Sequence, residues 1–245
     1  MLPNQRAVLI TFALLVWLAP VGALQAQQCK SVQSAATVAT VVELYTSEGC
    51  DSCPPTDRWL SEARRARPEL IAAAFHVDYW DRLGWKDRFA SPAFTARQAQ
   101  SVASSGARFA YTPQLIVNGR DWRGSVLPPA STQIASVSLR LQRGAGDQVS
   151  VNLHRLADAP AQVQLWWAAV EDGHQSEVKA GENRGVILKH DAVVRDYARV
   201  PAAGGDQRLM LKLPAMGESG RKRTLVVVAT DAATGTVLQA AQLGC

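Results

Sequence analysis

The hydrophobic pattern of this 245-residue chain changes near Gly144, and this change constrains the fold more than any other feature. Before Gly144, apolar runs with strand spacing alternate with segments of helical spacing. After Gly144, only short strand-like runs occur, with turn residues between them. We therefore predict an α/β unit over residues 27–144, followed by a small β-sandwich over residues 145–245.

The expected elements follow from the local spacing of apolar residues. In the first half we expect strands at 38–45 and 70–79, helices at 57–67, 91–104 and 128–143, and a hairpin of 114–117 and 120–123 around Asn118-Gly119. In the second half we expect strands at 148–153, 162–170, 186–188, 192–200, 208–213, 224–229 and 237–243. Ser91 followed by Pro92 is a typical helix start.

The first 26 residues have the composition of a secretory signal. Arg6 precedes an apolar run at residues 7–19, and small residues follow near its end. We expect residues 1–26 to be removed and the mature chain to be periplasmic or secreted, with no stable membrane insertion afterwards. An uncleaved membrane anchor is the alternative, although the run is short for a span of about 20 residues.

Export determines whether the cysteines can form lasting disulfides. An oxidising compartment allows disulfides to persist, and four cysteines allow three pairings. The simplest pairing is Cys50–Cys53 together with Cys29–Cys245. Alternatively, Cys29 and Cys245 are free or pair between chains.

The motif Cys50-Asp51-Ser52-Cys53 stands between a predicted strand and a predicted helix. The N–H groups at a helix start lower the pKa of a nearby thiol, whereas the charge of Asp51 opposes thiolate formation. In such pairs the first cysteine attacks and the second resolves the mixed disulfide. A proline biases the preceding residue towards extended conformations, so the two prolines after Cys53 predict a helix that begins near Pro55, with both cysteines ahead of it.

Residues 41–60 resemble the thioredoxin fold, whose cis-proline loop would correspond to Thr112-Pro113. The resemblance implies that Pro113 and Thr112 dock the substrate backbone. More narrowly, several segments together resemble an exported bacterial family, domain of unknown function 1223 (DUF1223). These segments are GCDSCPPTDRWL, HVDYWDRLGWKD, SPAFTARQ, YTPQLIVNGR and GENRGVILKHDAVVR. That family is assigned a thioredoxin-like fold, and its activity is not established.

Three functions fit the C-x-x-C motif. The first is thiol–disulfide exchange on a protein or small thiol, an enzyme activity with no cofactor. The second is copper(I) binding by Cys50 and Cys53 with His76 or His190, because thiolates select this soft ion. The third is a binding module in which the disulfide is only structural. Nucleic-acid binding is not expected, because the net charge of +5 is small and spread out.

Other residues are candidates for the same site. Asp78, Tyr79 and Trp80 follow a strand whose end shares an edge with the motif, so they either line the site or pack in the core. Glu43 lies in an apolar strand, where it either accepts a proton from Cys53, as a buried acid does in thioredoxins, or forms a salt bridge. His76 is either a ligand or a core residue.

The segment Glu182-Asn183-Arg184-Gly185 is a polar cluster in the second half of the chain. We expect it to pack near the cysteines and to bring Arg184 or His190 to them. An arginine there would favour the thiolate. The alternative is a hydrogen-bond network without a chemical role.

Overall fold

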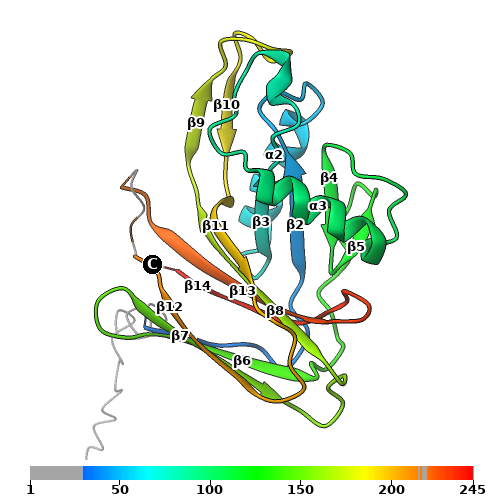
Figure 1. Ribbon diagram of the computed structural model, residues 1–245, viewed down its shortest axis with the longest axis vertical. Coiled ribbons are helices and arrows are strands. Elements are labelled where there is room, and N and C mark those ends of the chain that lie inside the picture. Colours follow the sequence, from blue (N-terminus) through cyan, green and yellow to red (C-terminus); the bar gives the residue numbers. More distant parts are fainter. Residues whose placement is uncertain (1–29, 215, 217–219, 245) are drawn as a thin grey trace, which may run out of the picture.

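The computed structural model describes residues 30–214, 216 and 220–244, so the expected signal segment and both Cys29 and Cys245 lie outside the described residues. One large sheet runs through the molecule (Figure 1). Its strands are β2 (Val41–Thr46), β3 (Ile71–His76), β4 (Gln114–Val117), β5 (Arg120–Trp122), β8 (Val163–Glu171), β11 (Val193–Arg199), β13 (Arg223–Asp231) and β14 (Val237–Leu243). Their order in the sheet is β14-β13-β8-β11-β3-β2-β4-β5.

The continuity of this sheet overturns the predicted fold class. β11 pairs in parallel with β3 at Val193 and Ala74, and the N–H of Ala74 donates to the carbonyl of Ala192 at 2.8 Å. The described chain has fourteen strands and two α-helices. It is therefore a mostly β structure, and a thioredoxin-like α/β fold followed by a β-sandwich is wrong. The division at residue 144 stays a prediction, and strands from both sides of it share the sheet.

A second sheet covers one end of the large one. It contains β1 (Ser31–Gln33), β6 (Val137–Arg143), β7 (Gln148–Arg155) and β12 (Gln207–Lys212), in the order β1-β6-β7-β12. Leu139 and Val151 from this sheet share a buried core with Leu165 and Leu225 from the large sheet. The predicted helix at 128–143 is wrong, because Val137, Leu139 and Leu141 alternate into this core with the period of a strand.

Two helices cover opposite faces of the large sheet. They are α2 (Pro54–Ala66) and α3 (Pro92–Ser105), and the side chain of Ser91 caps α3 as expected by accepting the N–H of Ala93. Leu60 of α2 packs with Val42 and Leu44, whereas Phe94 of α3 packs with Val41 and Tyr45. The side chains of β2 therefore alternate between an α2 face and an α3 face.

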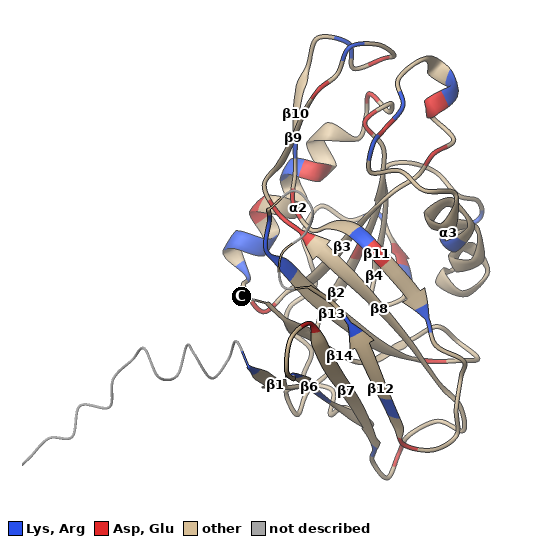
Figure 2. Cartoon of the chain, turned by 60° about the vertical axis from the view of Figure 1, so that its left-hand side comes forward, with Lys and Arg blue, Asp and Glu red and all other residues tan. Residues whose placement is uncertain are grey.

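A two-stranded arm stands apart from both sheets. It is formed by β9 (His174–Glu177) and β10 (Ile187–His190), which connect β8 to β11. Figures 1 and 2 both show the arm beside α2. Among the described residues, no helix combines the length and the apolar character that crossing a membrane requires.

Arg97 of α3 joins the two halves of the large sheet. Its guanidinium lies 4.9 Å from the ring centre of Phe75 on β3 and 4.4 Å from that of Trp166 on β8. It donates to Glu43 of β2 and to the hydroxyl of Tyr197 on β11, both at 2.6 Å. Burial alone would lower the pKa of Arg97, but the facing Glu43 raises it, so the guanidinium keeps its charge.

We expect Arg97→Met to lower the free energy of unfolding by about 3–5 kcal/mol, because Glu43 is left buried without its cation. The double variant Arg97→Met, Glu43→Gln should recover part of the loss. Urea unfolding measures the effect, with the exposed Arg199→Met as the control. Equal stability of the Arg97→Met and control variants would contradict the structural role of Arg97.

Candidate functional site

The C-x-x-C motif lies in a short loop between β2 and α2. The N–H of Cys50 donates to the carbonyl of Ser47, and that of Cys53 donates to the carbonyl of Cys50. Helix α2 begins at Pro54, so both cysteines precede it, and it starts one residue earlier than expected. The expected extended conformation of Cys53 is wrong. Its φ of −77° and ψ of −40° are helical, because its carbonyl accepts the first helical N–H bonds, from Thr56 and Asp57.

Cys50 and Cys53 form a disulfide, and both residues are 0% exposed. The two residues between them, Asp51 and Ser52, are exposed. The hydroxyl of Ser52 lies 3.5 Å from the sulfur of Cys50. The disulfide is therefore inaccessible in this conformation, although solvent reaches the residues on the loop between the cysteines.

Trp80 connects this loop to the Thr112–Pro113 segment, whose peptide bond is cis. The indole N–H of Trp80 donates to the hydroxyl of Thr112 at 2.8 Å. On its other side, Trp80 approaches Gly49 so closely that a Cβ there would lie 2.9 Å from the Cβ of Trp80. Only glycine fits at position 49 without a shift of the tryptophan.

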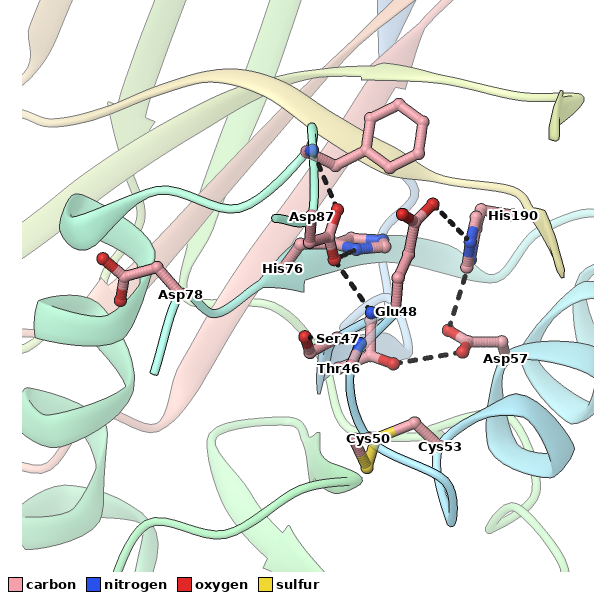
Figure 3. Close-up of polar contacts among 12 residues, drawn as sticks. Thr46, Ser47, Glu48, Cys50, Cys53, Asp57, His76, Asp78, Asp87 and His190 are labelled. Carbon is pink, nitrogen blue, oxygen red and sulfur yellow. Dashed lines mark hydrogen bonds and ion pairs between the residues drawn. A yellow bond between two sulfur atoms is a disulfide. The ribbon is translucent and has the colours of Figure 1, made fainter. Parts of the chain in front are cut away.

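Asp78 and Tyr79 are engaged elsewhere. Asp78 accepts the hydroxyl of Thr95 on α3 at 2.5 Å, and Figure 3 shows it well apart from the disulfide. Tyr79 packs against the core on the α3 face, and burial raises its pKa. Of the three residues expected after this strand, Trp80 is the one that contacts the disulfide loop.

A buried polar cluster lies beside the disulfide on the α2 face (Figure 3). Its members are Glu48, Asp57, His76, Asp87 and His190. The Nδ1 of His76 lies 2.6 Å from Asp87, which also accepts the N–H groups of Glu48 and Phe89. Asp57 accepts the hydroxyl of Thr46 at 3.1 Å. The cluster therefore joins the loop before Cys50 to the first turn of α2.

The charges in this cluster compensate one another. Burial opposes ionisation of His76 and Asp87, but their mutual attraction and hydrogen bond raise the pKa of His76 and lower that of Asp87. Burial likewise opposes ionisation of Glu48, whose pKa is nevertheless lowered by the adjacent His190 and by the hydrogen bond from the indole N–H of Trp85. Burial raises the pKa of Asp57. Of the three carboxyl groups in the cluster, Asp57 is thus the one that most readily takes up a proton.

His190 comes to this cluster from the arm. Its Nε2 lies 3.3 Å from Glu48, and its Nδ1 lies 4.0 Å from Asp57. Neither contact has the geometry of a hydrogen bond, and neither nitrogen has another partner among the described residues. His190 therefore lies between two acidic side chains without a hydrogen bond to either of them.

The turn of the arm reaches the disulfide loop directly. The amide of Asn183 donates to the carbonyls of Glu48 and Cys50, both at 2.9 Å. The carboxylate of Glu182 accepts the N–H of Asp51 at 3.2 Å. The polar segment 182–185 thus packs near the cysteines as expected, but Asn183 and Glu182 make the contacts while Arg184 is exposed.

Glu43 lies away from the disulfide. It is on the α3 face of β2, where it pairs with Arg97, whereas Thr46 and Asp57 are on the α2 face. A strand side chain cannot reach the opposite face of its sheet. Of the two roles expected for Glu43, the structure places it in the salt bridge.

A family model described as "Protein of unknown function (DUF1223)" matches residues 41–230. The chain belongs to the DUF1223 family. A search of curated proteins found no match.

Two solved structures resemble this DUF1223 protein. Protein AGR_C_4864 from Agrobacterium tumefaciens, known from X-ray crystallography, is 24% identical, with a TM-score of 0.61 over 86% of this chain and 96% of that one. HBP35 of Porphyromonas gingivalis is 14% identical, with a TM-score of 0.54 over 85% of this chain and 76% of that one. At these identities the likeness concerns the fold alone.

The residues expected for copper are divided between two sets in this DUF1223 chain. The sulfurs of Cys50 and Cys53 are bonded to each other, while His76 and His190 belong to the polar cluster. Over residues 30–214, 216 and 220–244, no group of three or more His, Cys, Asp or Glu side chains is arranged to hold a metal ion.

Glu48, Asp57 and Asp87 were not among the residues expected from the sequence. Asp57 follows Cys53 by four residues, and this spacing places both on one face of a helix, so it could have been found. Glu48 and Asp87 are brought together by loops, which the periodicity of the sequence does not place.

We expect Asp87→Asn to lower the free energy of unfolding by about 3–5 kcal/mol near pH 6, because the buried pair with His76 is broken. The lowered pKa of Asp87 gives stability that is lost as pH falls below its ordinary value of 3.8. The raised pKa of His76 gives stability that is lost as pH rises through the folded-state value, above 6.5.

The difference between wild type and Asp87→Asn should therefore be largest between about pH 4 and 6.5 and should narrow on both sides. Urea unfolding at several pH values measures it. The exposed Asp206→Asn, which removes the partner of His154, is the matched control. A difference that does not change with pH would contradict an ionised pair.

Proposed function

We propose that this chain is an exported thiol–disulfide exchange protein that acts on a protein or small-thiol partner through Cys50 and Cys53. The observation that carries the proposal is the disulfide at the start of α2, beside the Thr112–Pro113 segment that Trp80 connects to it. Export is inferred from the composition of residues 1–26. Exchange of this kind needs no organic cofactor.

The local chemistry supports two different roles for the cysteines. The sulfur of Cys50 belongs to the loop whose next residues, Asp51 and Ser52, face solvent, so a small opening of the loop exposes it. Cys53 lies directly before α2, at the positive end of the helix dipole, and this position favours a thiolate there. A stable thiolate is a good leaving group when the disulfide is attacked.

The proposed reaction consists of two consecutive thiol–disulfide exchanges. In the dithiol form, the thiolate of Cys50 attacks a substrate disulfide, which gives a mixed disulfide and a substrate thiolate that takes up a proton. The thiolate of Cys53 then attacks the sulfur of Cys50, so the Cys50–Cys53 disulfide forms and the second substrate thiol leaves. The substrate disulfide is reduced and the cysteine pair is oxidised. The reverse direction uses the same path.

We expect the Cys50–Cys53 pair to equilibrate reversibly with glutathione at a potential between about −120 and −270 mV. Alkylation followed by cleavage at Lys and Arg measures it, because residues 31–58 form one peptide that contains these two cysteines and excludes Cys29 and Cys245. A pair that stays oxidised well below about −300 mV would show a structural disulfide and would overturn the proposal.

The two cysteines should also differ in a trapping experiment. We expect Cys53→Ala to accumulate a mixed disulfide with glutathione at Cys50, because no resolving thiol remains. Cys50→Ala, the matched control, should accumulate much less, because Cys53 is the resolving residue. Mass measurement of the peptide distinguishes the two variants. Equal labelling of both would contradict the assignment of Cys50 as the attacking residue.

A further inference from the structure

The turn of the arm, residues 178–186, contacts the disulfide loop. Thiol–disulfide exchange at Cys50 does not by itself require these contacts. We call this segment the arm tip. It is closed on itself by the bond from the N–H of Val178 to the carbonyl of Val186 at 3.0 Å. It reaches across to the chain at residues 48–51, about 130 positions earlier in the sequence, through the three hydrogen bonds of Asn183 and Glu182.

These hydrogen bonds hold the main chain of the disulfide loop. Of the three main-chain groups bonded by the arm tip, one is the carbonyl of Cys50 and one is the N–H of its neighbour Asp51. Asn183 is itself only 6% exposed, so its side-chain amide is buried against the disulfide loop. Any displacement of the Cys50 backbone from its present position must break these bonds.

Because the sulfurs are buried, the hydrogen bonds from the arm tip affect how easily the disulfide can react. A thiolate must reach a disulfide sulfur in order to attack it, and exchange rates depend on that access. Both cysteines are 0% exposed, although the residues between them face solvent. The loop must therefore move before the disulfide reacts, and the arm tip opposes that movement.

The arm tip is built so that it can separate from the loop. β9 and β10 pair only with each other in the described structure and form a sheet of their own. Residues 184–187 are exposed. By contrast, His190 at the base of the arm is buried between Glu48 and Asp57. Residues 184–187 are therefore open to a partner, whereas Val178 and Asn183 of the tip are buried.

We propose that the arm tip is a clamp on the disulfide loop, with Asn183 as its positioning residue, and that the Cys50–Cys53 pair reacts only when the tip lifts. This inference rests on the proposed exchange function and concerns the regulation of the same site. A partner that displaces the tip would gain access to Cys50, and the pair would be protected from other thiols.

The test is the rate at which dithiothreitol reduces the disulfide of the mature chain under native conditions. Samples are quenched with an alkylating reagent and the peptide of residues 31–58 is counted by mass. We expect Asn183→Ala to be reduced at least about tenfold faster than wild type, which corresponds to about 1.4 kcal/mol in the free energy of opening. Asn183→Asp should act similarly, because a carboxylate cannot donate to the two carbonyls.

Asn152→Ala is the matched control, because Asn152 lies on β7 in the other sheet and is half-buried. It should be reduced at the wild-type rate. Urea unfolding of every variant separates local release from global loss of stability, since a clamp changes the reduction rate by more than the unfolding free energy explains. If the Asn183 variants do not fold, the exposed Glu182→Ala removes the acceptor of the remaining bond from the N–H of Asp51 and should accelerate reduction severalfold.

If the Asn183 and Glu182 variants are reduced at the wild-type rate, the clamp is overturned. The exchange function then still holds, provided that the reduction potential of the Cys50–Cys53 pair lies in the expected range. Faster reduction of these variants, combined with a potential well below about −300 mV, would support the clamp as a cover for a structural disulfide and overturn the exchange function. The two failures are therefore distinguishable.

Discussion

The pairing of β11 with β3 is the constraint on which the rest of the architecture depends. It places strands from the second half of the chain directly beside the first-half strands that lead to the disulfide. Because the arm connects β8 to β11, this pairing also determines where the arm goes. It extends past the end of the sheet next to α2, where His190 and Asn183 reach residues 48–57.

The alternation of β2 divides the buried charges into two compensated groups. On the α3 face, Glu43 meets the guanidinium of Arg97, which is enclosed by aromatic rings. On the α2 face, beyond the end of β2, three carboxyl groups meet two histidines. Isolated buried charges are costly, so each group is stable only when its partners are complete. The partners come from segments far apart in the sequence, and the charges therefore link distant parts of the fold.

Local features of the sequence predicted local structure well. Ser91-Pro92 marked the start of α3, and Asn118-Gly119 between residues 114–117 and 120–123 marked a hairpin. The motif before Pro54 marked a loop followed by a helix. Residues 128–143 were mistaken for a helix, although Val137, Leu139 and Leu141 alternate as in a strand. The fold class could not be reached in this way, because the apolar pattern of a strand does not say which strand pairs with it. For the same reason Glu48 and Asp87 were missed. Of the two roles expected for Glu43, the salt bridge is the one that the structure shows.

The arm tip holds the disulfide loop through main-chain carbonyl and N–H groups, not through the side chains of that loop. The side chains of Asp51 and Ser52 take no part in that attachment, and both residues are exposed, with the Ser52 hydroxyl 3.5 Å from the sulfur of Cys50. Substitution at these two positions can adjust the acidity of the neighbouring sulfurs without altering how the loop is held. With the proposed clamp, the chemical character of the cysteine pair and its accessibility would depend on different residues: Asp51 and Ser52 for the first property, and the turn of the arm for the second.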